Sequence, residues 1–166
     1  AGGHLALAAG MLTSQVGMER QCPGDRMRST WNIGPTNTEK LEVAAIVNWY
    51  GITDVSDLLN TGPGASGNFT EAWIGSSPNR SAIAARVSPV NHIRQDLPPI
   101  ISIHGDEDSI VPYSQGIKLH EALNRAGLPN ELITIEGGGH GGFSPSQMTD
   151  IYAAIYRFLD EHGVGN

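Results

Sequence analysis

Two segments of the sequence place side chains capable of acid–base chemistry directly after predicted buried strands. Asp106 and Asp108 follow the apolar run that ends at His104, and His140 follows the run that ends at Ile135. In an open parallel sheet, ligands bind at the edge where the carboxyl ends of the strands meet. A histidine whose ring is oriented by a carboxylate is the base of a nucleophilic triad. The two segments together therefore predict nucleophilic catalysis.

Each of these residues also has an ordinary explanation when it is taken alone. Aspartates in such loops commonly hydrogen-bond their own backbone, and a single loop histidine is often a surface residue. His140 differs because it lies between Gly137–Gly139 and Gly141–Gly142, a costly setting unless the backbone must be unusually shaped or closely approached. An acid followed by a base, on the ends of successive strands, indicates a catalytic site more specifically than either residue does alone.

Strands that alternate with helices are predicted to position these loops. The expected elements are a helix over Gly3–Val16, strands over Val43–Tyr50, Pro99–His104 and Glu131–Ile135, a helix over Ser114–Ala126 that ends at Gly127, and a last helix that begins at Ser144-Pro145 and ends near His162-Gly163. Residues 19–40 are interpreted as a surface loop, and 53–95 as an irregular insert with short helical pieces. This order indicates an α/β fold with a mostly parallel sheet and helices on its faces.

The number of strands is small for such a sheet. The first helix is apolar on every side, which is typical of a buried helix, yet no strand precedes it. We therefore expect residues 1–166 to form the C-terminal portion of a single domain and to pack against an N-terminal half.

The composition excludes several classes of partner. The formal net charge is −7 and the ten Lys and Arg are scattered, which argues against a nucleic-acid partner. No apolar run is long enough to predict a membrane span. Cys22 is the single cysteine, so no internal disulfide is possible. A cytoplasmic and a secreted location both stay open.

Four segments resemble one family. The stretch from Pro98 to Pro112 resembles the acid-bearing segment of α/β-hydrolase esterases, and Gly137–Phe143 resembles their histidine loop. The opening Ala1–Leu7 resembles the residues after the nucleophile in Gly-x-Ser-Ala-Gly-Gly-His-Leu, in the branch of carboxylesterases, acetyl xylan esterases and feruloyl esterases. Ser88-Pro89-Val90 resembles the segment that precedes the acid strand in this branch. The acid-before-histidine order also matches that of the α/β-hydrolases.

The resemblance implies a role for individual residues. It places the acid on Asp108, three residues before Val111, and the base on His140. It places the nucleophile on a serine immediately before Ala1, outside this chain, and one oxyanion-hole donor on the Ala1 N–H. No metal or organic cofactor is expected.

Several other residues have both a functional and a packing explanation. Trp49, Tyr50 and Trp73 are candidates for a substrate pocket, although ordinary packing explains them equally well. Neither Ser66 nor Ser144 completes a Gly-x-Ser-x-Gly elbow. Neither of them follows a strand and begins a buried helix, so we expect neither to be the nucleophile. His4 is expected to be structural and His104 to bond within the loop that holds Asp108. The remaining three histidines are expected at the surface: His92, His120 and His162.

The expected function is hydrolysis of carboxylic esters. By resemblance, the substrate is a small molecule with a short acyl chain, or an acetyl or feruloyl ester linked to plant polysaccharide. Two alternatives stay open: a serine peptidase of the same fold, and an inert fragment or binding relative.

Overall fold

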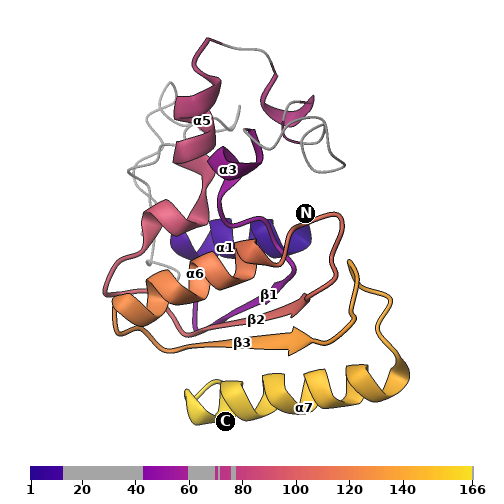
Figure 1. The fold of residues 1–166 in the computed structure, drawn as a ribbon. Helices are drawn as coiled ribbons and strands as arrows, with labels where there is room; N and C mark the ends of the chain where they lie inside the picture. The colour runs from indigo at the N-terminus through magenta and orange to yellow at the C-terminus, as the bar shows by residue number, and fades with distance from the viewer. Residues whose placement is uncertain (13–42, 60–69, 71, 76–77, 166) are drawn as a thin grey trace, which may run out of the picture.

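The computed structural model describes residues 1–12, 43–59, 70, 72–75 and 78–165 (Figure 1). In chain order the elements are α1 (Gly2–Met11), β1 (Ile46–Trp49), α3 (Val55–Leu59), α5 (Arg80–Val87), the 3-10 helix η3 (Pro89–His92), β2 (Ile100–Gly105), α6 (Ser114–Arg125), β3 (Asn130–Ile135) and α7 (Pro145–Glu161). The predicted loop at 19–40, the end of the first predicted helix and part of the insert lie outside the described residues.

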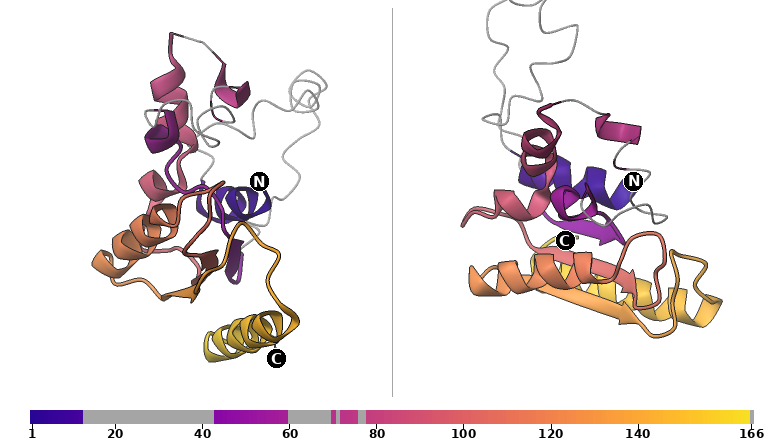
Figure 2. Two further views of the ribbon diagram at one scale, coloured as in Figure 1. Left: turned by 45° about the vertical axis from the view of Figure 1, so that its right-hand side comes forward. Right: turned by 45° about the horizontal axis from the view of Figure 1, so that its top comes forward.

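The described strands form one parallel sheet in the order β1-β2-β3. Ile46 pairs with Ile100, and Ile100 pairs with Asn130. Helices α1 and α6 cover one face of this sheet and α7 covers the other (Figures 1 and 2). The predicted α/β architecture, with helices on both faces, is confirmed. Among the described residues, no helix combines the length and the apolar character needed to cross a membrane.

The central strand β2 is buried along its whole length because both of its faces are covered. Ile100 packs with Leu119 and Leu123 of α6 in one hydrophobic cluster. Ile101 and Ile103 belong to a second cluster, with side chains of α7. A strand buried on both faces needs apolar residues on both sides, which explains the largely apolar run that predicted it.

The ends of two helices carry the signals expected from the sequence. Ser144 caps α7: its hydroxyl accepts from the Gln147 N–H at 3.2 Å, and the Gln147 side chain accepts from the Ser144 N–H at 2.8 Å. This reciprocal pair is a capping box, which gives hydrogen-bond acceptors to two backbone N–H groups that have none within the helix. Gly127 follows α6 with a φ of 68°, the left-handed conformation of a helix C′ residue.

Strand β1 is shorter than predicted, beginning at Ile46 instead of Val43. Its partner β2 begins only at Ile100, after two prolines that have no N–H to donate, and the Ile46 N–H bonds to Pro99 O at 2.9 Å. Val43 lies beyond this pairing and is 43 % exposed.

The prediction that His120 lies at the surface is wrong: the residue is 4 % exposed. Its Nδ1–H donates to Asn130 Oδ1 at 2.7 Å, and its Nε2 accepts from the Ser102 hydroxyl at 2.7 Å. Ser102 Oγ in turn accepts from Asn48 Nδ2 at 2.9 Å. Polar partners on the sheet thus satisfy the imidazole and permit its burial.

Buried histidines should make stability depend on pH. Burial lowers the pKa of His4, His104 and His120. The folded state therefore keeps these rings neutral, while the unfolded state takes up protons as the pH falls below the ordinary histidine pKa of about 6.5. We expect the free energy of unfolding to be fully retained above about pH 6.5 and to fall below it, on the order of 1 kcal/mol per ring per pH unit, towards the lowered folded values.

Urea unfolding at about pH 7.5 and about pH 5.5 measures this dependence, and a His120→Gln variant, which cannot take up the proton, should show a weaker one. If the free energy of unfolding changed equally with pH in the two proteins, His120 would not contribute to the pH dependence.

Candidate active site

The loops that follow β2 and β3 are in direct contact at the carboxyl end of the sheet. The Asp106 N–H bonds to Ile135 O at 3.2 Å, and the Glu107 N–H bonds to Gly138 O at 3.0 Å. A Cβ at Gly105 would lie 2.1 Å from Gly138 O, which leaves room only for glycine. The loops predicted to carry the acid and the base are therefore packed backbone to backbone.

Asp106 connects these loops, and among the described residues no hydrogen bond or ion pair joins its side chain to His140. Its Oδ1 accepts from the Gly137 N–H at 2.7 Å, while Gly137 has a φ of 64°. Asp106 itself is exposed. Asp106 therefore binds the loop backbone, as aspartates in such loops commonly do.

Asp108 is the carboxylate that meets the histidine. Its side chain is completely buried, and Oδ1 accepts from the N–H groups of Ile110 at 2.8 Å and Val111 at 2.9 Å. Its Oδ2 lies 2.8 Å from His140 Nδ1. These donors satisfy the buried carboxylate oxygens.

His140 is held at Nδ1, and its side chain is partly exposed. When Nδ1–H donates to ionised Asp108, the neutral ring carries its lone pair on Nε2, where it can accept a proton. The side chain is 27 % exposed, so the ring is not sealed inside the loops. The pair is able to act as a general base whose tautomer is fixed by a carboxylate.

His104, near the end of β2, lies beside the Asp108 carboxylate. Its Nε2–H donates to Val111 O at 2.9 Å and lies 3.4 Å from Asp108 Oδ2. Its Nδ1 is buried without a hydrogen-bond partner among the described residues, beside Gly116, where a Cβ would lie 3.2 Å away. The expectation that His104 bonds within the acid loop agrees with this geometry.

The beginning of α1 lies at the same edge of the sheet as these loops (Figure 1). Ala1 is the N-cap of α1, and its carbonyl accepts from the Leu5 N–H at 3.0 Å. Gly3 packs against Gly51, where a Cβ would lie 2.8 Å from Cα, and His4 Nδ1–H donates to Ile52 O at 2.8 Å. The first turn of α1 is thus fixed to the segment after β1, and His4 has the structural contact expected of it.

The three aromatic candidates lie in different surroundings. The Tyr50 ring contacts the His140 ring, with centroids 4.4 Å apart. Trp49 contacts Tyr152 of α7 and packs against the core on that face. Trp73 is 59 % exposed, and its ring meets the edge of His4 at 5.6 Å.

Ser144, one of the two rejected serines, lies within the described residues and has a structural role. Its hydroxyl caps α7, as described above. Ser66 lies outside the described residues.

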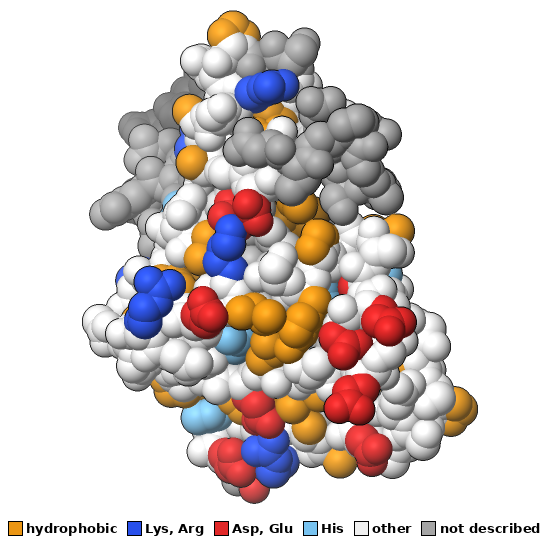
Figure 3. Space-filling model, in the orientation of Figure 1, with side chains coloured by type: hydrophobic (Ala, Val, Ile, Leu, Met, Phe, Trp, Pro, Cys, Tyr) orange, Lys and Arg blue, Asp and Glu red, His pale blue; other side chains and the backbone are white. Residues whose placement is uncertain are grey.

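The surface around the strand ends is acidic. Asp106, Glu107 and Glu136 are exposed at this edge, and Figure 3 shows acidic side chains on the side where β2 and β3 end. Within the described ranges, no group of three potential ligand side chains is arranged to hold a metal ion.

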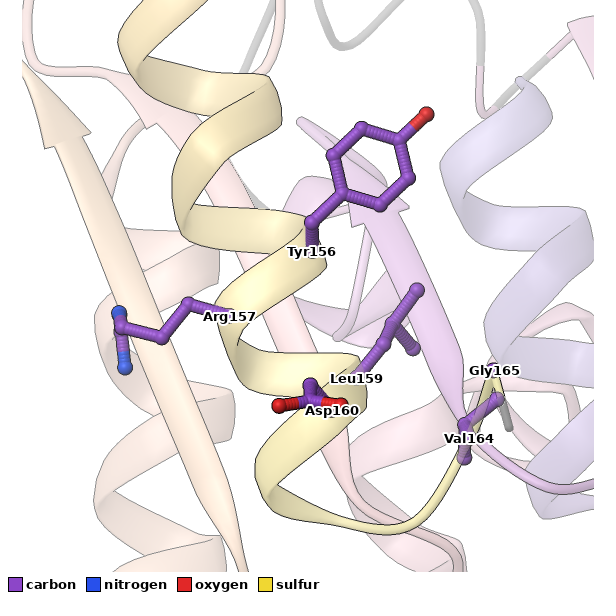
Figure 4. Close-up of a pocket in the computed structure, with 6 residues that line it drawn as sticks. All are labelled: Tyr156, Arg157, Leu159, Asp160, Val164 and Gly165. Carbon is purple, nitrogen blue, oxygen red and sulfur yellow. The ribbon is translucent and has the colours of Figure 1, made fainter.

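The pocket of about 580 Å³ drawn in Figure 4 is elsewhere. It is lined by residues of the last turns of α7 and the segment after it: Tyr156, Arg157, Leu159, Asp160, Val164 and Gly165. It therefore does not include the Asp108–His140 pair.

A family model supplies the identification. The model of the BD-FAE family matches residues 1–123, which include α1, the sheet strands β1 and β2, and Asp108. The chain belongs to the BD-FAE family. This BD-FAE chain therefore has an esterase-like α/β-hydrolase fold. His140 lies beyond the matched range.

Solved esterases have the same fold as this BD-FAE chain. Esterase 2 of Thermogutta terrifontis, phosphoramylated by tabun, is 26 % identical with a TM-score of 0.66, over 98 % of this chain and 52 % of that one. A truncated carbohydrate esterase from gut microbiota is 29 % identical with a TM-score of 0.59, over 74 % of this chain and 44 % of that one. The chain thus spans about half the length of these structures.

A curated relative is named for the release of acylamino acids. The acylamino-acid-releasing enzyme of Mus musculus is 25 % identical over 124 residues, which is 72 % of this chain and 16 % of that protein.

The sequence contained a signal for site residues that were not predicted. Asn48 and Ser102 are polar residues inside apolar strand runs, and both are 0 % exposed. A buried polar residue must be hydrogen-bonded, so each signals an internal network. Asn48 Oδ1 accepts from the Gly51 N–H at 3.0 Å and so shapes the turn that carries Tyr50.

Proposed function

We propose that the full-length protein is a serine esterase whose acid is Asp108 and whose base is His140. The observation that carries the proposal is the 2.8 Å bond between His140 Nδ1 and the buried Asp108 carboxylate, at the carboxyl edge of the sheet in a BD-FAE chain. The nucleophile is the serine that we infer immediately before Ala1. A residue at that position would precede α1, and the nucleophile of this fold lies on a turn that leads into a helix.

The mechanism is acyl transfer to water in two half-reactions. The serine oxygen forms a bond to the ester carbonyl carbon while His140 Nε2 takes the serine proton. The tetrahedral oxyanion accepts a hydrogen bond from the Ala1 N–H, where the partial positive charge of the α1 N-terminus also stabilises it. The carbonyl re-forms, the C–O bond to the alcohol breaks, and His140 gives its proton to the leaving oxygen. Water then attacks the acyl-serine in the same way and releases the acid.

The two carboxylates near the site have separate roles in this mechanism. Asp108 keeps Nδ1 of His140 protonated and stabilises the imidazolium that forms. Asp106 only holds the histidine loop through the Gly137 N–H.

The proposed substrates are short-chain carboxylic esters, including acetyl or feruloyl groups on plant polysaccharide. The similarity to a carbohydrate esterase from gut microbiota supports a carbohydrate-linked ester. The similarity to the acylamino-acid-releasing enzyme favours a second candidate, a peptidase that releases acylated amino acids.

Substrate preference separates the two candidates. We expect the full-length protein to hydrolyse an aryl acetate and methyl ferulate with a much higher kcat/KM than an acetyl-aminoacyl anilide. The control replaces the serine before Ala1 with alanine and should remove all of these activities. A higher kcat/KM for the anilide would refute the esterase assignment and support the peptidase.

A further inference from the structure

Tyr50 has an unusual backbone for its residue type. Its φ is 39°, and it is the one non-glycine residue with a positive φ among the described ranges. A bulky side chain pays a conformational cost in this region, so such a residue persists only where its surroundings determine it. An outlier of this kind suggests that the conformation serves a purpose.

The conformation places the tyrosine ring against the candidate base. The Tyr50 and His140 ring centroids are 4.4 Å apart, with the planes inclined by 54°. Phe143 follows in the same loop, and the centroid of its ring lies 6.2 Å from that of Tyr50. The Tyr50 hydroxyl lies 3.2 Å from where a Cβ at Gly141 would be, so the ring covers both His140 and its neighbour.

Three sets of hydrogen bonds hold the turn that bears Tyr50. The Tyr50 N–H donates to Ile103 O at 2.8 Å, which ties it to β2. The Gly51 N–H donates to Asn48 Oδ1 at 3.0 Å, across the turn itself. Asn48 Nδ2 donates to Ser102 Oγ, the first bond of the buried chain through His120 to Asn130.

The buried chain has a fixed direction. Asn130 Nδ2 donates to Leu128 O at 2.8 Å and to Asn124 Oδ1 at 2.7 Å, so its Oδ1 faces His120 as an acceptor. His120 must then carry its proton on Nδ1, and Ser102 must donate to Nε2. Every buried polar atom of the Asn48 side chain is thereby fixed, and the turn cannot relax without breaking a buried bond.

We propose that Tyr50 is a positioning residue for His140, and that the chain Asn48–Ser102–His120–Asn130 holds Tyr50 in its left-handed conformation for this purpose. The tilted tyrosine ring packs against the imidazole and restricts its rotation about the Asp108 bond. Because Asp108 bonds the ring at Nδ1, a second contact is needed to fix the plane of the ring. This inference rests on the proposed function of His140.

The test compares Tyr50→Gly, Tyr50→Asn and Tyr50→Phe in the full-length protein. Glycine and asparagine both accept a positive φ but remove the ring, so the fold should be retained while kcat falls by about 10-fold or more. Phenylalanine keeps the ring and should restore most of kcat. Tyr156→Leu, at a tyrosine that is 69 % exposed on α7, is the matched control and should retain wild-type activity.

A spectroscopic readout isolates positioning from general stability. The downfield proton resonance of the His140 Nδ1–H, identified by its loss in His140→Ala, should broaden or shift in Tyr50→Gly and Tyr50→Asn and return in Tyr50→Phe. Wild-type kcat and an unchanged resonance in the two variants without a ring would overturn the inference while leaving the function in place. Full activity in His140→Ala would overturn both.

Discussion

Replacing His140 with alanine is expected to lower kcat for ester hydrolysis by about 10⁴-fold or more in the full-length protein, with KM changed little. The reason is that Nε2 of this ring is the proposed acceptor of the serine proton, and removing the acceptor acts on the transition state and not on substrate binding. Steady-state kinetics with an aryl acetate measures the effect.

The fold should survive the His140 substitution. The side chain is 27 % exposed, and Asp108 keeps its bonds from the Ile110 and Val111 N–H groups. His92→Ala is the matched control, because that ring bonds only to Arg86 O near η3 in the described contacts. A His140→Ala protein that is folded and keeps more than a small fraction of kcat would contradict the proposed base.

The second large effect is expected from Asp108→Asn, with a loss of about 10⁴-fold in kcat. An asparagine can still accept from the Ile110 and Val111 N–H groups, so the loop should stay folded. Its amide, however, no longer requires the proton to be on Nδ1 of His140 and cannot stabilise an imidazolium. Kinetics and a thermal unfolding curve on the same samples separate the chemical effect from stability.

Asp106→Asn provides the matched control for charge and position. Its side chain still accepts from the Gly137 N–H, and we expect kcat to change by less than about 10-fold. If the two substitutions had equal effects, or if Asp106→Asn had the larger one, the assignment of the acid to Asp108 would be wrong.

The alternation of strands and helices was readily predictable because it depends on local patterns. Largely apolar runs such as Ile100–Ile103 indicate strands covered on both faces, and Ser144 and Gly127 are local signals for helix ends. The parallel order follows from that alternation, and the structure confirms it.

Features that depend on partners distant in the sequence were not predictable in the same way. His120 was wrongly expected at the surface, since the polar atoms that satisfy it come from Ser102 and Asn130. Strand β1 was expected to begin at Val43, but the prolines before β2 leave no partner there. The positive φ of Tyr50 had no sequence signal, because no glycine or asparagine occupies that position.

The candidate site falls between these two cases. Spacing alone left Asp106 and Asp108 as equal candidates, and the resemblance to esterases favoured Asp108. In the structure Asp108 meets His140 and Asp106 meets the Gly137 backbone, a division of roles set by the contact between Gly105 and Gly138. The roles in catalysis, and the serine before Ala1, remain the proposal.

Covalent labelling of the full-length protein with a serine-reactive organophosphonate tests this proposal most directly. After labelling, intact mass and peptide mapping locate the phosphonyl group, with His140→Ala treated in parallel. We predict a single adduct on the serine immediately before Ala1, formed far more slowly in His140→Ala. An adduct on Ser66 or Ser144, no adduct at all, or equal labelling rates in both proteins would contradict the proposed triad.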